Sequence, residues 1–286
     1  MAGTLTLHCL KPGGGAYLVD AGRPGFLARG IPAGGPADFR ARDAANRLLG
    51  QPLDTPCLEI TLTAGQWLLN GRGQIVLTGA DMNWRLNGRL LEPYQVHYLD
   101  GDYLLTGTAA RRGLRTYLAV LGTWELPRSL GSGETGLPDV PTIDSSWSVE
   151  VKWQHEAPFR MELEVDRHWP ALPSTVTVVP GPEWSWLTET EQKRLLSMTY
   201  LVGPASNRQG IRLVGNGGVP EHKLPSLLSS PVLPGILQLT PSGLILLGPD
   251  AQTVGGYPRP LLVAEQEALA TIFQVGIGEE ISFKQE

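Results

Sequence analysis

The stretch Asp250-Ala251-Gln252-Thr253-Val254-Gly255-Gly256-Tyr257-Pro258-Arg259 lies between two apolar runs, residues 244–247 and 261–263. Short apolar runs of this kind are typical of buried strands, so the stretch is predicted to be a turn held by two strands. Its paired glycines would let a backbone approach a ligand closely, and a proline beside an arginine can aim a guanidinium at a carboxylate or phosphate. The alternative interpretation is a hairpin loop that carries polar residues but binds nothing.

A second loop of the same character lies near the N-terminus. Asp20-Ala21-Gly22-Arg23-Pro24-Gly25 is followed by a glycine- and proline-rich stretch that ends at Asp38, directly before a predicted helix. Binding residues are often carried by loops on a rigid scaffold. Two such loops far apart in the sequence predict one shared cleft.

The composition favours a β-rich protein of short strands. The 286 residues include 35 glycines and 24 prolines spread along the chain, which is typical of many tight turns. A net charge of −5 without a basic run argues against a nucleic-acid partner. The two cysteines show no metal-type spacing, so we expect no metal site and a reducing, cytoplasmic compartment. No apolar run approaches the roughly 20 residues that span a bilayer, so no membrane partner is expected.

Residue patterns predict two helices and a series of short strands. Residues 38–49 are predicted to form a helix, because Phe39, Ala45 and Leu49 fall on one helical face and Gly50 stops it. Residues 188–200 are predicted to form a second helix, which begins with Thr188 and Glu191 in capping-box spacing. Asn87-Gly88 and Asp100-Gly101 predict hairpin turns. A short helical piece is expected at 269–273, and residues 122–148 are expected to form a loop or connection. The predicted strands are 4–10, 57–63, 66–70, 74–78, 83–86, 96–99, 103–105, 115–121, 148–153, 159–165, 175–180, 236–239, 244–247, 261–264 and 280–283.

The polar residues of the predicted loops suit a small ligand. The sequence has no lysine-bearing phosphate loop, no nucleophile elbow and no HExxH motif. Glu221-His222 is adjacent in extended chain, where neighbouring side chains point in opposite directions. What remains is a set of guanidiniums, amides and carboxylates that could bind a carboxylate- or amide-bearing molecule and polarise its carbonyl. The alternative is that the arginines and aspartates pair with one another and tie loops to a barrel.

Seven stretches in order resemble successive motifs of the biotin-dependent carboxyltransferase/allophanate hydrolase subunit 2 family. The resemblance extends from about residue 20 to residue 283. The stretches are DAGRPGFLARGIPAGGPAD (20–38), ANRLLGQPLDTPCLEIT (45–61), TGAD (78–81), GLRTYLAVLG (113–122), SNRQGIRL (206–213), SPVLPGILQLTPSG (230–243) and DAQTVGGYPR (250–259).

The resemblance implies a mainly β fold of cyclophilin-like β-barrel architecture with a few short helices in two closely packed lobes. We expect a β-rich lobe with one helix over residues 1–95 and the barrel lobe over 96–286. The resemblance also implies a hetero-oligomer in which this chain, as the C component, and the A and B components cleave 5-oxo-L-proline to L-glutamate with ATP. Two alternatives are a carboxyltransferase subunit of a biotin-dependent urea or acyl carboxylase, and a non-catalytic regulator that binds a kinase inhibitor similar to the B component.

The family motifs imply a set of site residues. The catalytic candidates are Asp38, Arg208, Gln252 and Arg259. The substrate-binding candidates are Arg23, Asp81, Asn207, Arg212, Gln238, Asp250, Thr253 and Tyr257.

The chain departs from the family pattern at several positions. An arginine expected in the stretch Ser132-Gly133-Glu134-Thr135 is missing, and Glu134 would disfavour an anion there. The basic, glycine-rich stretch that normally follows is replaced by Leu137-Pro138-Asp139-Val140. Further departures are Val19, Ala37, Ser230 and Val254.

Overall fold

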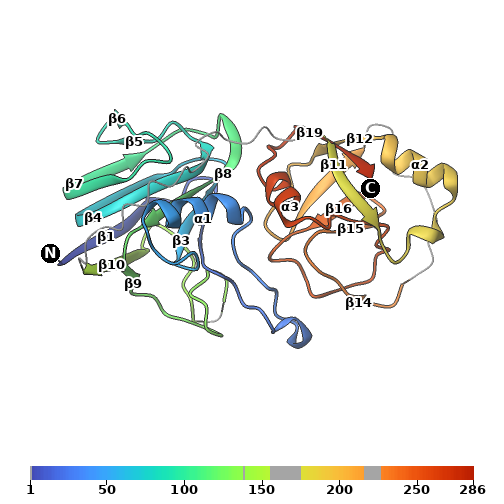
Figure 1. Ribbon diagram of the computed structural model, residues 1–286, viewed down its shortest axis with the longest axis horizontal. Coiled ribbons are helices and arrows are strands. Elements are labelled where there is room, and N and C mark those ends of the chain that lie inside the picture. Colours follow the sequence, from blue (N-terminus) through green and yellow to red (C-terminus); the bar gives the residue numbers. More distant parts are fainter. Residues whose placement is uncertain (1, 138, 155–174, 216–226) are drawn as a thin grey trace. The chain divides into compact units, whose positions relative to one another are not determined.

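The computed structural model describes residues 2–137, 139–154, 175–215 and 227–286 (Figure 1). The chain divides into two compact units, each described here by itself. The first comprises Met1–Arg23 and Gly34–Pro170, and the second comprises Pro24–Ala33 and Ala171–Glu286. No helix within the described ranges is long and apolar enough to cross a membrane. The strand expected at 159–165 and the pair Glu221-His222 lie outside these ranges.

The first unit is a ten-stranded sheet in which all pairs are antiparallel. Its main path runs β2-β3-β8-β4-β1-β10-β9, and β7 joins β4 while the β5–β6 hairpin joins β7. The strands are β1 (Ala2–Lys11), β2 (Ala16–Val19), β3 (Cys57–Thr61), β4 (Gln66–Asp81), β5 (Arg85–Leu86), β6 (Arg89–Leu90), β7 (His97–Thr106), β8 (Arg112–Val120), β9 (Thr123–Trp124) and β10 (Ser148–Gln154).

Both faces of this sheet carry apolar packing, because alternate residues point to opposite sides. In β3, Leu58 and Ile60 belong to the larger core cluster, whereas Cys57 belongs to the cluster under helix α1 (Phe39–Leu48). The helix lies against the sheet beside β4 and β8 (Figure 1). The hydroxyl of Thr78 donates to the Ala41 carbonyl at 2.6 Å and fastens the helix to β4.

The strands predicted at 66–70 and 74–78 form one long strand, and so do those predicted at 96–99 and 103–105. The turn expected at Asp100-Gly101 was therefore wrong. Gly71 of β4 faces Gly101 of β7 in the pairing register, and both have positive φ (106° and 122°). Facing glycines let the two strands bend together without ending the ladder.

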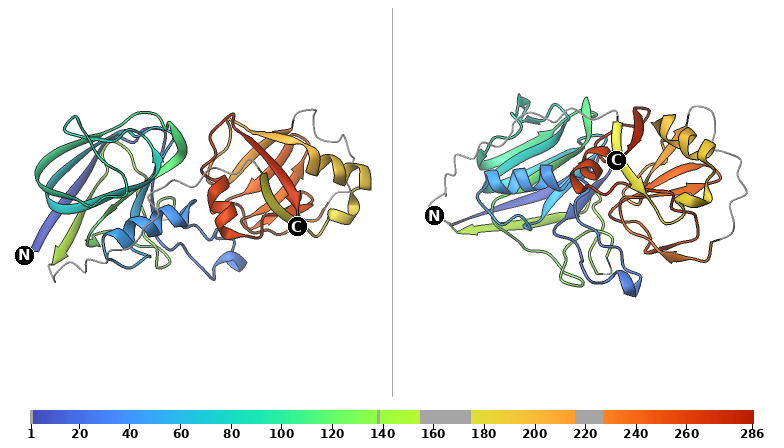
Figure 2. Two further views of the ribbon diagram at one scale, coloured as in Figure 1. Left: turned by 45° about the horizontal axis from the view of Figure 1, so that its top comes forward. Right: turned by 45° about the vertical axis from the view of Figure 1, so that its right-hand side comes forward.

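The second unit is a closed seven-stranded barrel with the order β11-β18-β15-β16-β13-β12-β19 (Figure 2). The pairing of β11 with β19 is parallel, and the other barrel pairs are antiparallel. A two-stranded ribbon, β14–β17, accompanies the barrel. The elements are β11 (Thr175–Pro180), β12 (Thr199–Val202), β13 (Gly210–Gly215), β14 (Ser230–Pro231), β15 (Ile236–Thr240), β16 (Gly243–Leu247), β17 (Val254–Gly255), β18 (Leu261–Leu262), β19 (Glu280–Gln285), α2 (Glu189–Ser197), α3 (Gln266–Ile272) and the 3-10 turns η1 (Leu27–Arg29) and η2 (Trp184–Trp186).

The expected mainly β fold with a barrel and few short helices is confirmed, and so are both helix starts. The Asp38 side chain accepts hydrogen bonds from two backbone N–H groups at the start of α1. Thr188 and Glu191 form the expected capping box of α2. The second helix ends at Ser197 rather than Tyr200, because the chain turns into β12 at Thr199.

The division between the units falls at 170/171, not at the expected 95/96. Strands after residue 95 pair with strands before it: β7 with β4, and β8 with both β3 and β4. The β-rich lobe therefore continues through β10. Residues 24–33, inside the first glycine-rich loop, group with the second unit.

Candidate functional site

One end of the barrel gathers several of the predicted site residues. Gly210, the first residue of β13, pairs with Leu247, the last of β16, so the loops before and after these strands leave the same end. There Arg208 donates through Nε and Nη2 to the two carboxylate oxygens of Asp250, at 2.7 and 3.0 Å. The Arg208 side chain is buried and that of Asp250 is partly exposed. This fork-to-fork pair joins residues 42 apart in sequence and fixes the two loops to each other.

Two glutamine side chains meet beneath the turn that follows. Gln252 donates through Nε2 to Oε1 of Gln238 at 3.2 Å, and Gln238 donates to the Tyr257 carbonyl at 3.4 Å. Gln238 is buried, whereas Gln252 is exposed. A Cβ on Gly255 would overlap Nε2 of Gln238, so this glycine is needed for the backbone to approach the Gln238 amide. The exposed edge of the Gln252 carboxamide can still donate and accept hydrogen bonds with a ligand.

Arg259 is bound within the protein. It donates to Glu183 through its backbone N (2.8 Å), Nε (2.9 Å) and Nη2 (2.7 Å), and through Nη1 to the Pro231 carbonyl (2.8 Å). Hydrogen bonds from this guanidinium hold the pKa of Glu183 below its usual range, and the pairing raises the pKa of Arg259. Arg259 thus fits the alternative interpretation of the sequence, in which arginines pair with carboxylates and hold loops against the barrel. Glu183 was missed because its partner lies 76 residues away.

The remaining site candidates of the second unit are Asn207, Arg212, Thr253 and Tyr257. The Asn207 side chain accepts from the backbone N of Gln209 at 2.8 Å and of Gly210 at 3.4 Å, which closes the turn before β13. Arg212 is exposed on β13 while Arg208 is buried. The Thr253 carbonyl accepts from Val232 N at 3.0 Å, which extends the β14–β17 ribbon. Tyr257 is exposed.

In the first unit, Asp38 belongs to a buried polar network. Its backbone N donates to the Tyr117 hydroxyl at 2.7 Å, and that hydroxyl donates to Oε2 of Glu59 at 2.8 Å. The same oxygen accepts from Ala37 N at 2.9 Å, and Arg115 lies 3.5 Å from the other oxygen. Burial raises the pKa of Tyr117 well above its ordinary value, so the hydroxyl keeps its proton. The network fixes the residues that start α1.

Sequence reasoning missed Glu59 and Tyr117. The available signal was a lone charge inside the apolar stretch Cys57-Leu58-Glu59-Ile60, since a carboxylate in a buried strand requires partners.

Arg23 pairs with Glu134, one of the residues at which the chain departs from the family pattern. Its Nη1 donates to Oε2 of Glu134 at 2.6 Å, and Gly35 N lies 3.0 and 3.1 Å from the two Glu134 oxygens. Both side chains are buried. Asp20 holds this loop by accepting from the Ser132 hydroxyl at 2.7 Å and from Gly133 N at 2.8 Å. The guanidinium of Arg23, a substrate-binding candidate, is therefore engaged by the protein's own Glu134 carboxylate.

Asp81 lies at the exposed end of β4, where its side chain accepts from Asn83 N at 2.8 Å. It belongs to the first unit together with Arg23 and Asp38, and the other candidates belong to the second. A cleft shared by the two glycine-rich loops stays a prediction. Among the described residues, no group of three or more His, Cys, Asp or Glu side chains is placed to hold a metal ion.

Comparison with known families gives the assignment. Residues 29–285 match the family described as "Carboxyltransferase domain, subdomain A and B". The chain belongs to this family. It is 30% identical over 285 residues to the C component of the 5-oxoprolinase of Escherichia coli, covering 98% of this chain and 91% of that protein.

Urea amidolyases are also similar to this carboxyltransferase-family chain. The urea amidolyase of Lachancea kluyveri is 27% identical over 312 residues, which cover 96% of this chain but 16% of that protein. The crystal structure of the K. lactis urea amidolyase superposes with a TM-score of 0.81 at 22% identity, covering 97% of this chain and 18% of that one. This structural likeness shows a shared fold.

Proposed function

We propose that this chain is the C component of an ATP-dependent 5-oxoprolinase, which cleaves 5-oxo-L-proline to L-glutamate together with the A and B components. The observation that carries the proposal is the 30% identity with the C component of a 5-oxoprolinase over 91% of that protein's length. Buried free cysteines, Cys9 and Cys57, are compatible with the reducing cytoplasm in which we place the complex.

The carboxamide pair of the second unit suits this substrate. The ring amide of 5-oxoproline has its N–H and its C=O on the same side, and a primary carboxamide such as that of Gln252 can pair with both. Gln238 orients Gln252 through the 3.2 Å hydrogen bond, so less order has to be gained on binding. Donation to the ring carbonyl would polarise it for attack. The Arg208–Asp250 pair would hold the loop from which Gln252 projects.

We assign ATP to the complex and no step of its chemistry to this chain. The described residues include no glycine-rich loop that ends in a lysine, which is the usual cradle for nucleotide phosphates. Arg208, Arg259 and Arg23 are each engaged by a carboxylate.

The test is reconstitution. The chain is co-expressed with homologues of the A and B components, the complex is purified, and glutamate release from 5-oxoproline is measured with and without ATP. We expect ATP-dependent release that falls at least about tenfold in Gln252→Ala, because one hydrogen bond made in the transition state would be lost. Lys284→Gln, an exposed change on β19 at a residue outside the candidate site, is the comparison variant for folding and assembly. A folded three-component complex without ATP-dependent turnover would refute the proposal.

A biotin-dependent carboxyltransferase is the second candidate, favoured by the family description and by the similarity to urea amidolyases. Its distinguishing assay is the transfer of a carboxyl group from carboxybiotin to urea or an acyl acceptor. Transfer at a rate exceeding 5-oxoproline cleavage would favour this candidate.

A regulator without catalysis is the third candidate, favoured by the Glu134 carboxylate that engages Arg23. It predicts a complex with a kinase inhibitor similar to the B component and no turnover in either assay. Light scattering of the mixed proteins would detect that complex.

A further inference from the structure

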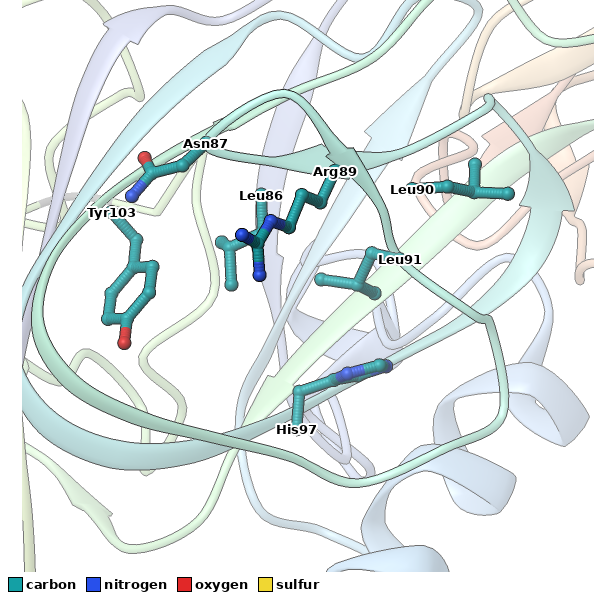
Figure 3. Close-up of a pocket in the computed structure, with 7 residues that line it drawn as sticks. All are labelled: Leu86, Asn87, Arg89, Leu90, Leu91, His97 and Tyr103. Carbon is teal, nitrogen blue, oxygen red and sulfur yellow. The ribbon is translucent and has the colours of Figure 1, made fainter.

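The first unit has a cavity that none of the predicted site residues lines. It has a volume of about 450 Å³ and lies beside the β5–β6 hairpin and the start of β7 (Figure 3). This volume is within the range of pockets that bind small molecules. Leu86, Leu90 and Leu91 supply its apolar lining.

The hairpin that forms one wall is fixed to β7. Asn87 N donates to the Leu104 carbonyl at 2.9 Å, and Leu104 N donates to Oδ1 of Asn87 at 2.7 Å. Asn87 and Gly88 have φ of 49° and 81°, the left-handed pair that a tight two-residue hairpin turn requires. The Arg85 guanidinium donates to the Gly88 carbonyl at 3.0 Å and braces the turn.

The opposite wall is also held. The imidazole Nε2 of His97 lies 2.8 Å from the Glu92 carbonyl, which can only accept, so Nε2 carries the hydrogen. Leu91 N donates to the Trp84 carbonyl at 2.9 Å, and the Leu91 side chain is buried. The cavity is therefore preformed, and filling it needs little reordering of its walls.

Arg89 differs from the other polar residues of the lining. Asn87, His97 and Tyr103 all make hydrogen bonds that hold the walls. The Arg89 backbone pairs with Leu86 in the hairpin, but its side chain makes no hydrogen bond or ion pair within the described part of the chain. Figure 3 shows its side chain extending from β6 toward Leu86. An unneutralised guanidinium beside an apolar wall is suited to an anion that carries an apolar body.

We propose that this cavity binds a small organic carboxylate with an aliphatic body. The Arg89 guanidinium would bind the carboxylate through two parallel hydrogen bonds, and the leucines would cover the aliphatic chain. A phosphate is disfavoured because it carries more charge than one guanidinium neutralises. The exposed Asp100 and Asp102 on β7 oppose polyanions in the same region. The proposal does not depend on the reaction proposed above.

Ligand-observed NMR titration of the full chain tests this inference with hexanoate as the probe. Acetate lacks the aliphatic body and 1-hexanol lacks the charge, so each should bind at least about tenfold more weakly than hexanoate if both features contribute. Arg89→Gln removes the cation and should weaken hexanoate binding about tenfold or more. Leu90→Ser removes part of an exposed apolar wall and should also weaken it.

Arg111→Gln is the matched control. It removes an exposed positive charge from the same unit without touching the cavity lining, and should leave hexanoate affinity unchanged within about twofold. Circular dichroism melts confirm that the variants fold. Absence of saturable hexanoate binding, wild-type affinity in Arg89→Gln, or equal losses in Arg89→Gln and Arg111→Gln would each overturn the proposal.

Discussion

Replacing Arg259 with Ala should destabilise the second unit strongly. Arg259 makes three hydrogen bonds to Glu183 and one to the Pro231 carbonyl, and the two side chains are 14% and 7% exposed. One of the bonds to Glu183 comes from the backbone and survives the substitution. The other two and the compensating charge are lost, which leaves a buried carboxylate without its cation. Breaking such a pair costs roughly 3–5 kcal/mol when it is fully buried, so we expect about 3 kcal/mol here, or roughly 10 °C in melting temperature.

The free energy of unfolding is measured by urea titration. Hydrogen exchange is then measured for the backbone amides of β11 and β18, because Glu183 follows β11 and Arg259 precedes β18. Arg259→Lys keeps the charge but loses the two-pronged geometry and should cost less. Removing both charges in Glu183→Leu/Arg259→Met should recover much of the loss, because no unpaired charge then remains. An Arg259→Ala protein as stable as wild type would show that the pair contributes nothing to stability, and would favour the catalytic role first expected of Arg259.

The Glu183–Arg259 pair should also make the stability of the fold decrease at acidic pH. The folded pKa of Glu183 is depressed, so its contribution is present above the unfolded value of about 4.3 and is lost as pH falls through the folded pKa. Glu183→Gln should therefore flatten the fall in melting temperature below about pH 5. If the melting temperature of Glu183→Gln falls with decreasing pH as steeply as that of the wild type, other carboxyl groups cause the loss of stability in acid.

Three further outcomes are expected. Gly34→Ala should destabilise the first unit by at least about 2 kcal/mol in urea unfolding, because φ at Gly34 is 67° and the new Cβ would strike the Glu134 carboxylate; an unchanged midpoint would contradict the close packing of this loop. Tyr117→Phe should cost about 1–3 kcal/mol, because the hydroxyl satisfies two buried groups; a loss below about 0.5 kcal/mol would argue against the network. Neither cysteine should react with a thiol reagent in the folded protein, since both are buried and burial raises the pKa of Cys9 to about 11 and that of Cys57 further; rapid labelling without denaturant would show that the units open.

Local sequence patterns predicted helix starts and turns correctly where one or two residues determine the backbone conformation. Asp38 and Thr188 mark helix starts because a side-chain oxygen satisfies backbone donors of the first turn. Asn87-Gly88 marks a turn because both residues adopt positive φ. Asp100-Gly101 carries the same signal but faces Gly71 across the sheet, and the long β4–β7 ladder overrides it.

The partners of the polar residues were harder to predict. The sequence singled out both Arg208 and Asp250 as site candidates, and their side chains pair in the structure. It did not indicate that Glu183 would take Arg259 or that Glu134 would take Arg23, because each pair joins loops that only the tertiary fold brings together. Several arginines and several carboxylates lie in loops of similar composition. Their separation in the sequence does not show which arginine pairs with which carboxylate.

Each unit contains a strand pair whose members lie far apart in the sequence. β1 pairs with β10 across the first unit, and β11 pairs in parallel with β19 across the second. A ribosome that has released residues through 154 has supplied every strand that the structure describes in the first sheet, whereas the barrel still lacks a member until Glu280–Gln285 emerges. The nascent chain would then carry one finished unit and one open set of apolar strands, β15 and β16 among them. Chaperone demand during translation should accordingly concentrate on the second half of the chain, and shortening it before β19 should leave the first unit folded and the barrel unclosed.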